Sequence, residues 1–179
     1  MTRFIALLSA IAAAAALRLV PHPPNFAPVG AVALFGGAKL QGWQAYFVPI
    51  AVMLLTDPIR SWAEGAHASY SWITLIIYGA FLINVLLGRI FLRNSSSPWR
   101  IASVALAGSI QFYLITNFPS WASAGSLYPH TWNGLITCYV AALPFFGRTL
   151  LGDLFYSGVL FGAYAVLSRR ASAAQQQAA

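Results

Sequence analysis

The side chains best suited to chemistry in this chain of 179 residues are three acids, three histidines and one cysteine. Asp57 and Asp153 each adjoin a long apolar run, and a carboxylate is too short to reach water from there as a lysine does. If these runs cross a membrane, such groups are costly and usually pair or line a water-filled cavity. We therefore expect both carboxylates either to form ion pairs, with Arg148 as the obvious partner for either, or to contact a ligand.

Cys138 and His130 form the one thiol–imidazole pair that could act as nucleophile and base. They lie eight positions apart with an expected helix start between them, so their spacing does not support a catalytic pair. Cys138 is expected to be buried and inert. A single cysteine excludes an intrachain disulfide and a cysteine-based zinc cluster. The sequence also lacks the zinc-protease, phosphate-loop and serine-hydrolase motifs. We expect no catalytic residue, no metal, no cofactor and no ATPase activity of its own.

The composition places these residues in a membrane protein. Hydrophobic residues make up 59% of the chain and charged residues 7%, whereas a soluble domain has about 45–50% and about 25%. A soluble enzyme, a nucleic-acid binder and a disordered protein are therefore poor interpretations. The net charge of +7 comes from basic residues scattered singly between apolar runs, which is typical of topology signals.

Six apolar segments are expected to cross the membrane and to form one all-α domain over residues 1–170, because a spanning helix needs about 20 mostly apolar residues. A further segment, Thr131–Phe146, is expected not to cross, and the tail Ala171–Ala179 is low in complexity and expected to be disordered in the cytoplasm. The six expected spans are Phe4–Val20, Ala27–Leu40, Tyr46–Thr56 extended by Trp43–Ala45, Tyr70–Leu92, Ile101–Phe118 and Leu150–Ser168.

The basic residues predict the orientation, because they concentrate on the cytoplasmic side of membrane proteins. With six spans and both termini in the cytoplasm, seven basic residues lie inside and three outside. If Thr131–Phe146 crosses as a seventh span, the count becomes six against four, so six spans are preferred. The inner residues are Arg3, Lys39, Arg89, Arg93, Arg100, Arg169 and Arg170, and the outer ones are Arg18, Arg60 and Arg148.

In this orientation all three acids and all three histidines fall on the outer side. Pro21–Pro28 holds four prolines, which rule out an ordinary helix, and is expected to cap the outer end of the bundle. A second loop, Phe118–Trp132, is rich in aromatic residues, and the two loops together suggest a lidded cavity. The expected ligand-binding residues are His22, Asn25, Phe26, Asp57, Asn117, Tyr128, His130, Arg148 and Asp153.

Small residues four positions apart let membrane helices approach closely. Gly158 and Gly162 have this spacing, and we expect them to pack within the chain. The alanine run of the first segment gives a flatter helix face than packing within the chain requires. Ala10, Ala14 and Ala16 are therefore expected to contact a partner helix.

Two stretches carry a family resemblance. RLVPHPPNFAPVGAVALFGGA, at Arg18–Ala38, resembles a signature of DUF6580, a family of bacterial inner-membrane proteins, and Leu114–Gly162 resembles the second half of that family. The family is in turn similar to the substrate-binding S-components of energy-coupling-factor transporters. That resemblance implies a six-helix bundle in the inner membrane, which binds a vitamin on its outer side and contacts a transmembrane coupling subunit with its ATPases.

Cobalamin is the first substrate candidate from this resemblance, although Cys138 cannot be aligned with a cobalt-ligating cysteine. Two other classes of function stay open. One is an intramembrane enzyme, which requires a competent catalytic pair at the outer cavity. The other is a non-transporting assembly subunit, whose polar residues would pair internally and leave no cavity.

Overall fold

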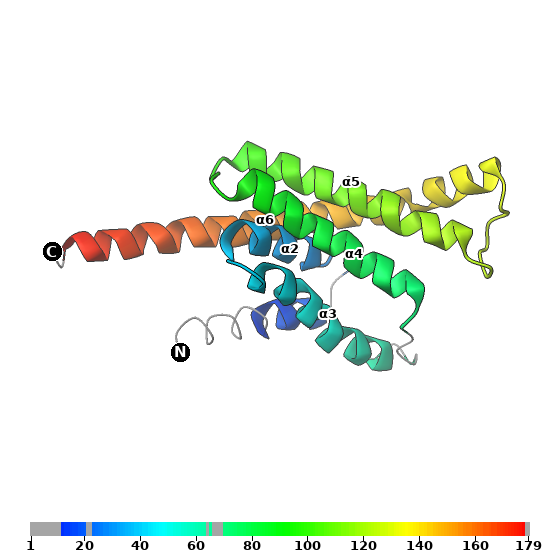
Figure 1. Ribbon diagram of the computed structural model, residues 1–179, viewed down its shortest axis with the longest axis horizontal. Helices are drawn as coiled ribbons and strands as arrows, with labels where there is room; N and C mark the ends of the chain where they lie inside the picture. Colours follow the sequence, from blue (N-terminus) through cyan, green and yellow to red (C-terminus); the bar gives the residue numbers. More distant parts are fainter. Residues whose placement is uncertain (1–11, 21–22, 64, 66–69, 178–179) are drawn as a thin grey trace.

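The computed structural model describes residues 12–20, 23–63, 65 and 70–177, and every regular element among them is helical. Residues 12–19 form a helical segment before the labelled elements. Figure 1 shows the helices gathered into an elongated bundle, with the last helix running along its length. The labelled elements are α2 (Val29–Lys39), α3 (Gln44–Ala63), α4 (Trp72–Leu87), the π-helical turn η1 (Gly88–Leu92), α5 (Pro98–Ala122) and α6 (Trp132–Gln177).

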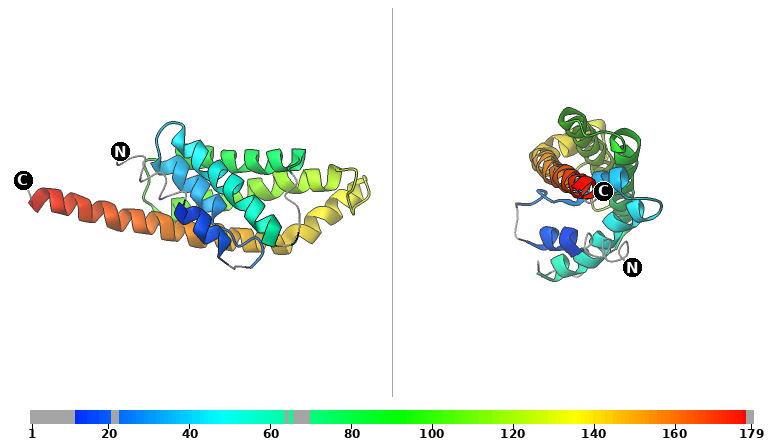
Figure 2. Two further views of the ribbon diagram at one scale, coloured as in Figure 1. Left: turned by 90° about the horizontal axis from the view of Figure 1, so that it is seen from below. Right: turned by 90° about the vertical axis from the view of Figure 1, so that its left-hand side faces the viewer.

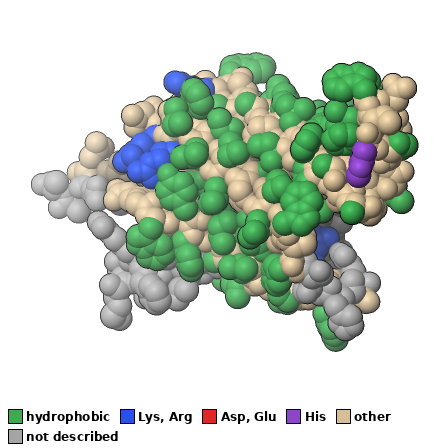
Figure 3. All heavy atoms as spheres, turned by 45° about the vertical axis from the view of Figure 1, so that its right-hand side comes forward, with side chains coloured by type: hydrophobic (Ala, Val, Ile, Leu, Met, Phe, Trp, Pro, Cys, Tyr) green, Lys and Arg blue, Asp and Glu red, His purple; other side chains and the backbone are tan. Residues whose placement is uncertain are grey.

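Three of the described helices are long and apolar enough to cross a membrane. They cover Trp72–Leu92, Pro98–Ala122 and Trp132–Arg170. Many of their large apolar side chains face outward, among them Leu75 and Ile90, and Figure 3 shows such side chains spread over one face of the molecule. Soluble proteins rarely expose apolar surface on this scale, so the arrangement indicates a membrane protein.

Helix α2 differs from its predicted role as a spanning segment. Its 11 residues make a helix about 16 Å long, whereas the hydrocarbon core of a bilayer is about 30 Å thick. Nine of these residues are buried, because α3, α4, α5 and α6 all pack around the helix. The prediction that Ala27–Leu40 spans the membrane by itself is therefore wrong: the segment is the enclosed centre of the bundle.

Two glycines bring α2 close to α4 and η1. A Cβ atom at Gly37 would lie 2.0 Å from the carbonyl oxygen of Val85, and one at Gly88 would lie 2.0 Å from that of Leu34. Neither position has room for any side chain. Because both obstacles are backbone atoms, the glycines set the distance between the two helices.

Helix α6 joins two segments that the sequence separates. Thr131–Phe146 was expected to be a stretch apart from the last span, but a single helix runs from Trp132 to Gln177 with Pro144 inside it. Figure 2 shows the helix changing direction along its length, as an internal proline causes. The same helix includes residues 171–177, so the prediction of a disordered tail is wrong there, since alanine and glutamine favour helix. Residues 178–179 lie outside the described residues.

The small-residue faces also differ from expectation. Ala14 is buried and packs in one cluster with Val32, Val48 and Val52 of the same chain, so its contact is intramolecular. Ala16 is exposed, and Ala10 lies outside the described residues. The glycine pair of α6 shows the reverse: a Cβ atom at Gly158 or Gly162 would meet nothing within 4 Å. These two glycines were predicted to pack within the chain, and the structure shows that they do not.

Candidate ligand-binding site

Two adjoining cavities lie beneath the segment that leads into α2. Their volumes are about 210 and 220 Å³. Both are lined by Asn25, Phe112 and Thr149, so they form two lobes around a shared wall, and we call them together the outer cavity. Asn25 has a φ of 65°, a left-handed conformation that asparagine tolerates better than most residues. The proline-rich segment thus presents an amide side chain to both lobes.

An ion pair closes one side of this region. The Nη1 atom of Arg18 lies 2.6 Å from the Oδ1 atom of Asp57, and the same nitrogen donates to the hydroxyl of Thr56. The hydroxyl of Tyr78 donates to the other carboxylate oxygen of Asp57 at 2.8 Å. This cluster joins the helical segment 12–19 to α3 and α4. The expected partner of Asp57 was Arg148, which is instead exposed on α6, and the structure corrects that prediction.

Asp153 is buried at the start of α2, with 2% of its surface exposed. Its carboxylate accepts a hydrogen bond from the hydroxyl of Ser109, at 2.7 Å, and faces the backbone N–H of Ala31. Ala31 is the third residue of α2, one of the four positions whose N–H groups have no partner inside a helix. Pro28, the residue that precedes α2, supplies no side-chain cap. Asp153 therefore caps α2 from a different helix, and Arg148 is not its partner.

Asn84, which lines one lobe, forms an amide pair with Gln111. The Nε2 atom of Gln111 donates to the Oδ1 atom of Asn84 and to the carbonyl oxygen of Ala80, both at 2.9 Å. The Nδ2 atom of Asn84 has no hydrogen-bond partner, although the residue is only 1% exposed. Asn84 lines the outer cavity, and an unpaired buried donor costs about 1–3 kcal/mol. An acceptor on a bound molecule would satisfy it.

Comparison with protein families now places the chain. Residues 1–176 match the family DUF6580, which is described as a family of unknown function. The chain belongs to DUF6580. Comparisons with curated proteins and with solved structures gave no match.

The structure of this DUF6580 protein brings together some of the predicted site residues. Asn25, Asn117 and Asp153 line the outer cavity, and Asp57 lies beside it through its pair with Arg18. Phe26 packs instead against the rings of Phe155 and Tyr156.

Other predicted residues lie away from the cavity. Tyr128 and His130 belong to the turn between α5 and α6, where the histidine ring contacts Trp121 and its Nε2 atom lies 3.2 Å from the carbonyl oxygen of Ser123. Arg148 does not line either lobe, and His22 lies outside the described residues. The α5–α6 turn is at the far end of the bundle (Figure 1, right). The prediction that it closes over the cavity together with the proline-rich segment is therefore wrong.

The thiol of Cys138 and the imidazole of His130, whose spacing did not support a catalytic pair, are separated in the structure. The sulfur of Cys138 lies 3.7 Å from the carbonyl oxygen of Asn117, and Cys138 is buried while His130 is exposed. Among the described residues, no group of three His, Cys, Asp or Glu side chains is placed to hold a metal ion.

Most of the residues that line the cavity were not predicted from the sequence, among them Asn84, Ser109, Phe112 and Thr149. Asn84 had a detectable signal, because it is an amide in the middle of the longest apolar run, where a polar group usually has a partner or a function. Ser109, Phe112 and Thr149 carry no such signal, since each residue type is common in membrane helices.

Proposed function

We propose that this DUF6580 protein is a multi-pass inner-membrane protein that binds a small molecule in the outer cavity for uptake, as the similarity to S-components implies. The observation that carries the proposal is the unpaired Nδ2 atom of Asn84 in the lining of a cavity with mostly apolar walls. Ligand sites combine such walls with a few convergent polar groups. Here Asn25, before α2, and Asn84, on α4, supply amides from two different parts of the chain.

The basic residues support the proposed orientation, with both termini in the cytoplasm. The end of α2, the end of η1, the start of α5 and the second half of α6 meet at one end of the bundle (Figure 1). Basic side chains gather at this end, as the positive-inside rule expects for the cytoplasmic side. They are Lys39, Arg89, Arg93, Arg100, Arg169 and Arg170.

The size of the outer cavity bears on the ligand. Each lobe is close to 200 Å³, below the range of about 300–1,000 Å³ that is usual for ligand pockets. Cobalamin remains the first compound to test because of the resemblance. The two lobes accommodate a smaller vitamin-like molecule better than a whole corrinoid.

We expect Asn25→Gly to weaken ligand binding about tenfold, which is the loss of one hydrogen bond of about 1.4 kcal/mol. Glycine keeps the left-handed backbone that Asn25 adopts, so the fold should be preserved. Thermal stabilisation of the purified protein, screened with cyanocobalamin and then with smaller water-soluble vitamins, identifies the ligand, and equilibrium dialysis then gives the affinity.

Asn94→Gly is the matched control, because Asn94 is also an exposed asparagine in a turn but lies at the other end of the bundle. The control should bind as the unaltered protein does. Equal affinity of both variants for the identified ligand would contradict the site, and failure of every screened vitamin to stabilise the protein would count against vitamin uptake.

The topology gives a separate prediction. In a Cys138→Ala background, a cysteine at Ala173 in the last helix should react with a membrane-impermeant maleimide only after spheroplasts are lysed. A cysteine at Leu127, which is 94% exposed in the α5–α6 turn, should react in intact spheroplasts. Labelling of Ala173→Cys in intact spheroplasts would overturn the proposed orientation.

A non-transporting assembly subunit is the second candidate, and one observation favours it. Asp57 and Asp153 both have partners within the chain, as that function predicts. The cavity and the unpaired amide of Asn84 favour ligand binding over this alternative.

A further inference from the structure

We propose that a second cavity, at the end of the bundle opposite the α5–α6 turn, binds one anionic phospholipid by its phosphate group and part of an acyl chain. The volume of this cavity is about 540 Å³, larger than either lobe of the outer cavity and within the usual range for ligands. It lies between the start of α5 and the second half of α6, next to the end of α2. The inference does not depend on the proposed uptake function. We call this space the basic cavity.

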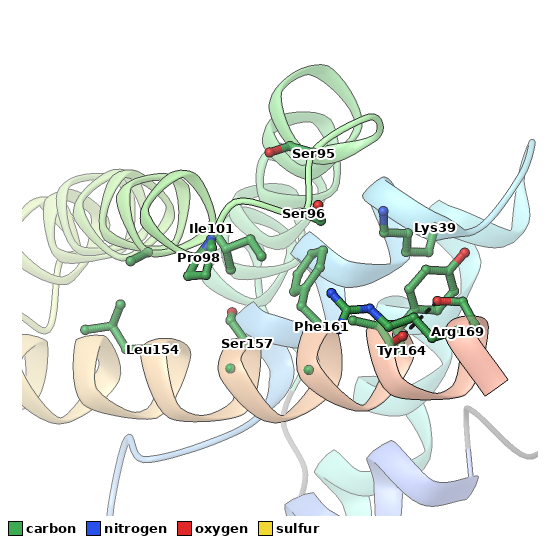
Figure 4. A pocket seen from close by; sticks show the side chains of 15 residues that line it. Lys39, Ser95, Ser96, Pro98, Ile101, Leu154, Ser157, Phe161, Tyr164 and Arg169 are labelled. Atoms are coloured by element: carbon green, nitrogen blue, oxygen red, sulfur yellow. Dashed lines mark hydrogen bonds between the residues drawn. The ribbon is translucent and has the colours of Figure 1, made fainter.

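Cationic and hydroxyl groups line one side of the basic cavity. Figure 4 shows Lys39 and Arg169 on the same side of it. The Nζ atom of Lys39 lies 5.1 Å from the ring centre of Tyr164 and 3.4 Å from the carbonyl oxygen of Arg93. Among the residues that the structure describes, no acidic side chain lines the cavity, so its charge is complementary to an anion.

The hydroxyl of Ser157 is a second, independent observation that points to a ligand site. It is 1% exposed, and its hydroxyl has no hydrogen-bond partner. A serine inside a helix commonly donates to the carbonyl four residues earlier, but this one does not. In Figure 4 its oxygen points into the cavity. A phosphate or ester oxygen of a lipid would accept this hydrogen bond.

The other side of the basic cavity is apolar and open. Ile101, Leu154 and Phe161 form its wall. Gly158 and Gly162 leave free space there, because a Cβ atom at either would meet nothing within 4 Å. The cavity therefore combines a cationic end with an uncharged trough, which is the shape of a lipid headgroup followed by an acyl chain.

A phospholipid fits this position better than a soluble anion does. Basic pockets between membrane helices on the cytoplasmic side are known to hold anionic lipid headgroups. A free phosphate would leave the apolar trough empty, whereas an acyl chain fills it.

The test measures lipid binding to the full chain in a nonionic detergent, by native mass spectrometry and by the thermal unfolding midpoint. We expect phosphatidylglycerol to bind and to raise the midpoint, and phosphatidylcholine to do neither at equal concentration. Lys39→Gln combined with Arg169→Gln should weaken phosphatidylglycerol binding roughly 30-fold, or about fivefold for each basic side chain. Gly158→Leu should abolish it, because leucine fills the trough.

Each variant has a matched control. Arg100→Gln combined with Arg170→Gln removes two exposed basic residues from the same end without touching the basic cavity, and should leave binding unchanged. Gly147→Leu adds the same side chain to α6 at another glycine with free space around it. It should also bind phosphatidylglycerol normally.

Four results would overturn the proposal. Equal losses in both double variants would indicate non-specific surface charge. Equal stabilisation by inorganic phosphate or glycerol 1-phosphate would indicate a soluble anion. Normal phosphatidylglycerol binding by Gly158→Leu would exclude the trough. Self-association that Gly158→Leu abolishes, without any lipid effect, would mark this face as an interface between copies of the chain.

Discussion

Gly88→Ala is expected to lower the free energy of unfolding by about 3 kcal/mol or more, at or beyond the upper end for an overpacked core. The added methyl group would lie 2.0 Å from the carbonyl oxygen of Leu34. A backbone oxygen inside a helix cannot turn away as a side chain can, so α2 and η1 must separate. Gly37→Ala should have a similar effect from the opposite side, since its methyl group would meet the carbonyl oxygen of Val85. Unfolding in detergent, followed by circular dichroism, measures both.

Gly79→Ala is the control for these substitutions. Gly79 belongs to α4, and a Cβ atom there would meet nothing within 4 Å. Because alanine favours helix over glycine by about 1 kcal/mol, this variant should be as stable as the unaltered protein or slightly more so. If Gly88→Ala and Gly79→Ala had equal stability, the close contact between α2 and η1 would be refuted.

The α2 contact matters for the site because both α2 and α4 contribute residues to the wall of the outer cavity. Gly30 at the start of α2 and Asn84 on α4 both line it, and Gly37 and Gly88 fix the separation of these helices. A variant at Gly88 that still folds should therefore also bind ligand more weakly. The effect on binding would be indirect, through the position of Asn84.

Hydropathy correctly predicted two of the long apolar helices. The runs at Tyr70–Leu92 and Ile101–Phe118 correspond to α4 with η1 and to α5, because a long apolar run has few alternatives to a spanning helix. Membership of DUF6580 was also predicted from the sequence. Hydropathy failed for α2, whose apolar residues face other helices rather than lipid, because composition does not distinguish these two surroundings.

The continuity of α6 was missed for a different reason. Thr131–Phe146, which contains Pro144, was predicted to be separate from the last span, and a proline does interrupt most helices of soluble proteins. In membrane helices neighbouring groups can satisfy the carbonyl that a proline leaves unpaired. The helix therefore bends and continues.

The structure has a cavity beneath the proline-rich segment, where the site was predicted, but several of the predicted contacts differ. Asp57 pairs with Arg18, 39 residues earlier in the chain, and not with Arg148. Spacing in the sequence predicts partners only within one helix, and the pairing of separate helices depends on how they pack. The same limit explains why the α5–α6 turn was placed over the cavity.

The second prediction with a large expected effect concerns the stability of a variant at Asp153. We expect Asp153→Ala to lower the free energy of unfolding by about 3 kcal/mol. The buried N–H of Ala31 loses its acceptor, which costs about 1–3 kcal/mol. The start of α2 also loses the polar group that faces the positive end of its dipole. Ser109 contributes little, because its hydroxyl also lies 3.1 Å from the carbonyl oxygen of Ala105 and can donate there.

Asp153→Asn keeps a hydrogen-bond acceptor at this position. The amide oxygen can still accept from Ala31, so this variant should lose less stability than Asp153→Ala. Thermal unfolding in detergent ranks the two variants, with Ser109→Ala as a control expected to lose about 1 kcal/mol. Equal losses of stability in Asp153→Asn and Asp153→Ala would mean that the N–H of Ala31 does not depend on this side chain.

Gly30 provides a decisive second site for the same hypothesis. A Cβ atom at Gly30 would lie 2.2 Å from the Oδ1 atom of Asp153, so Gly30→Ala should displace the carboxylate and destabilise the fold. In an Asp153→Ala background that obstacle is gone, and Gly30→Ala should then cost little. The double variant should therefore be more stable than the sum of the single losses predicts, with a coupling of about 0.5–3 kcal/mol, as expected for residues in contact. Strictly additive losses would show that Asp153 does not cap α2, and its burial would then have to be explained by the ligand.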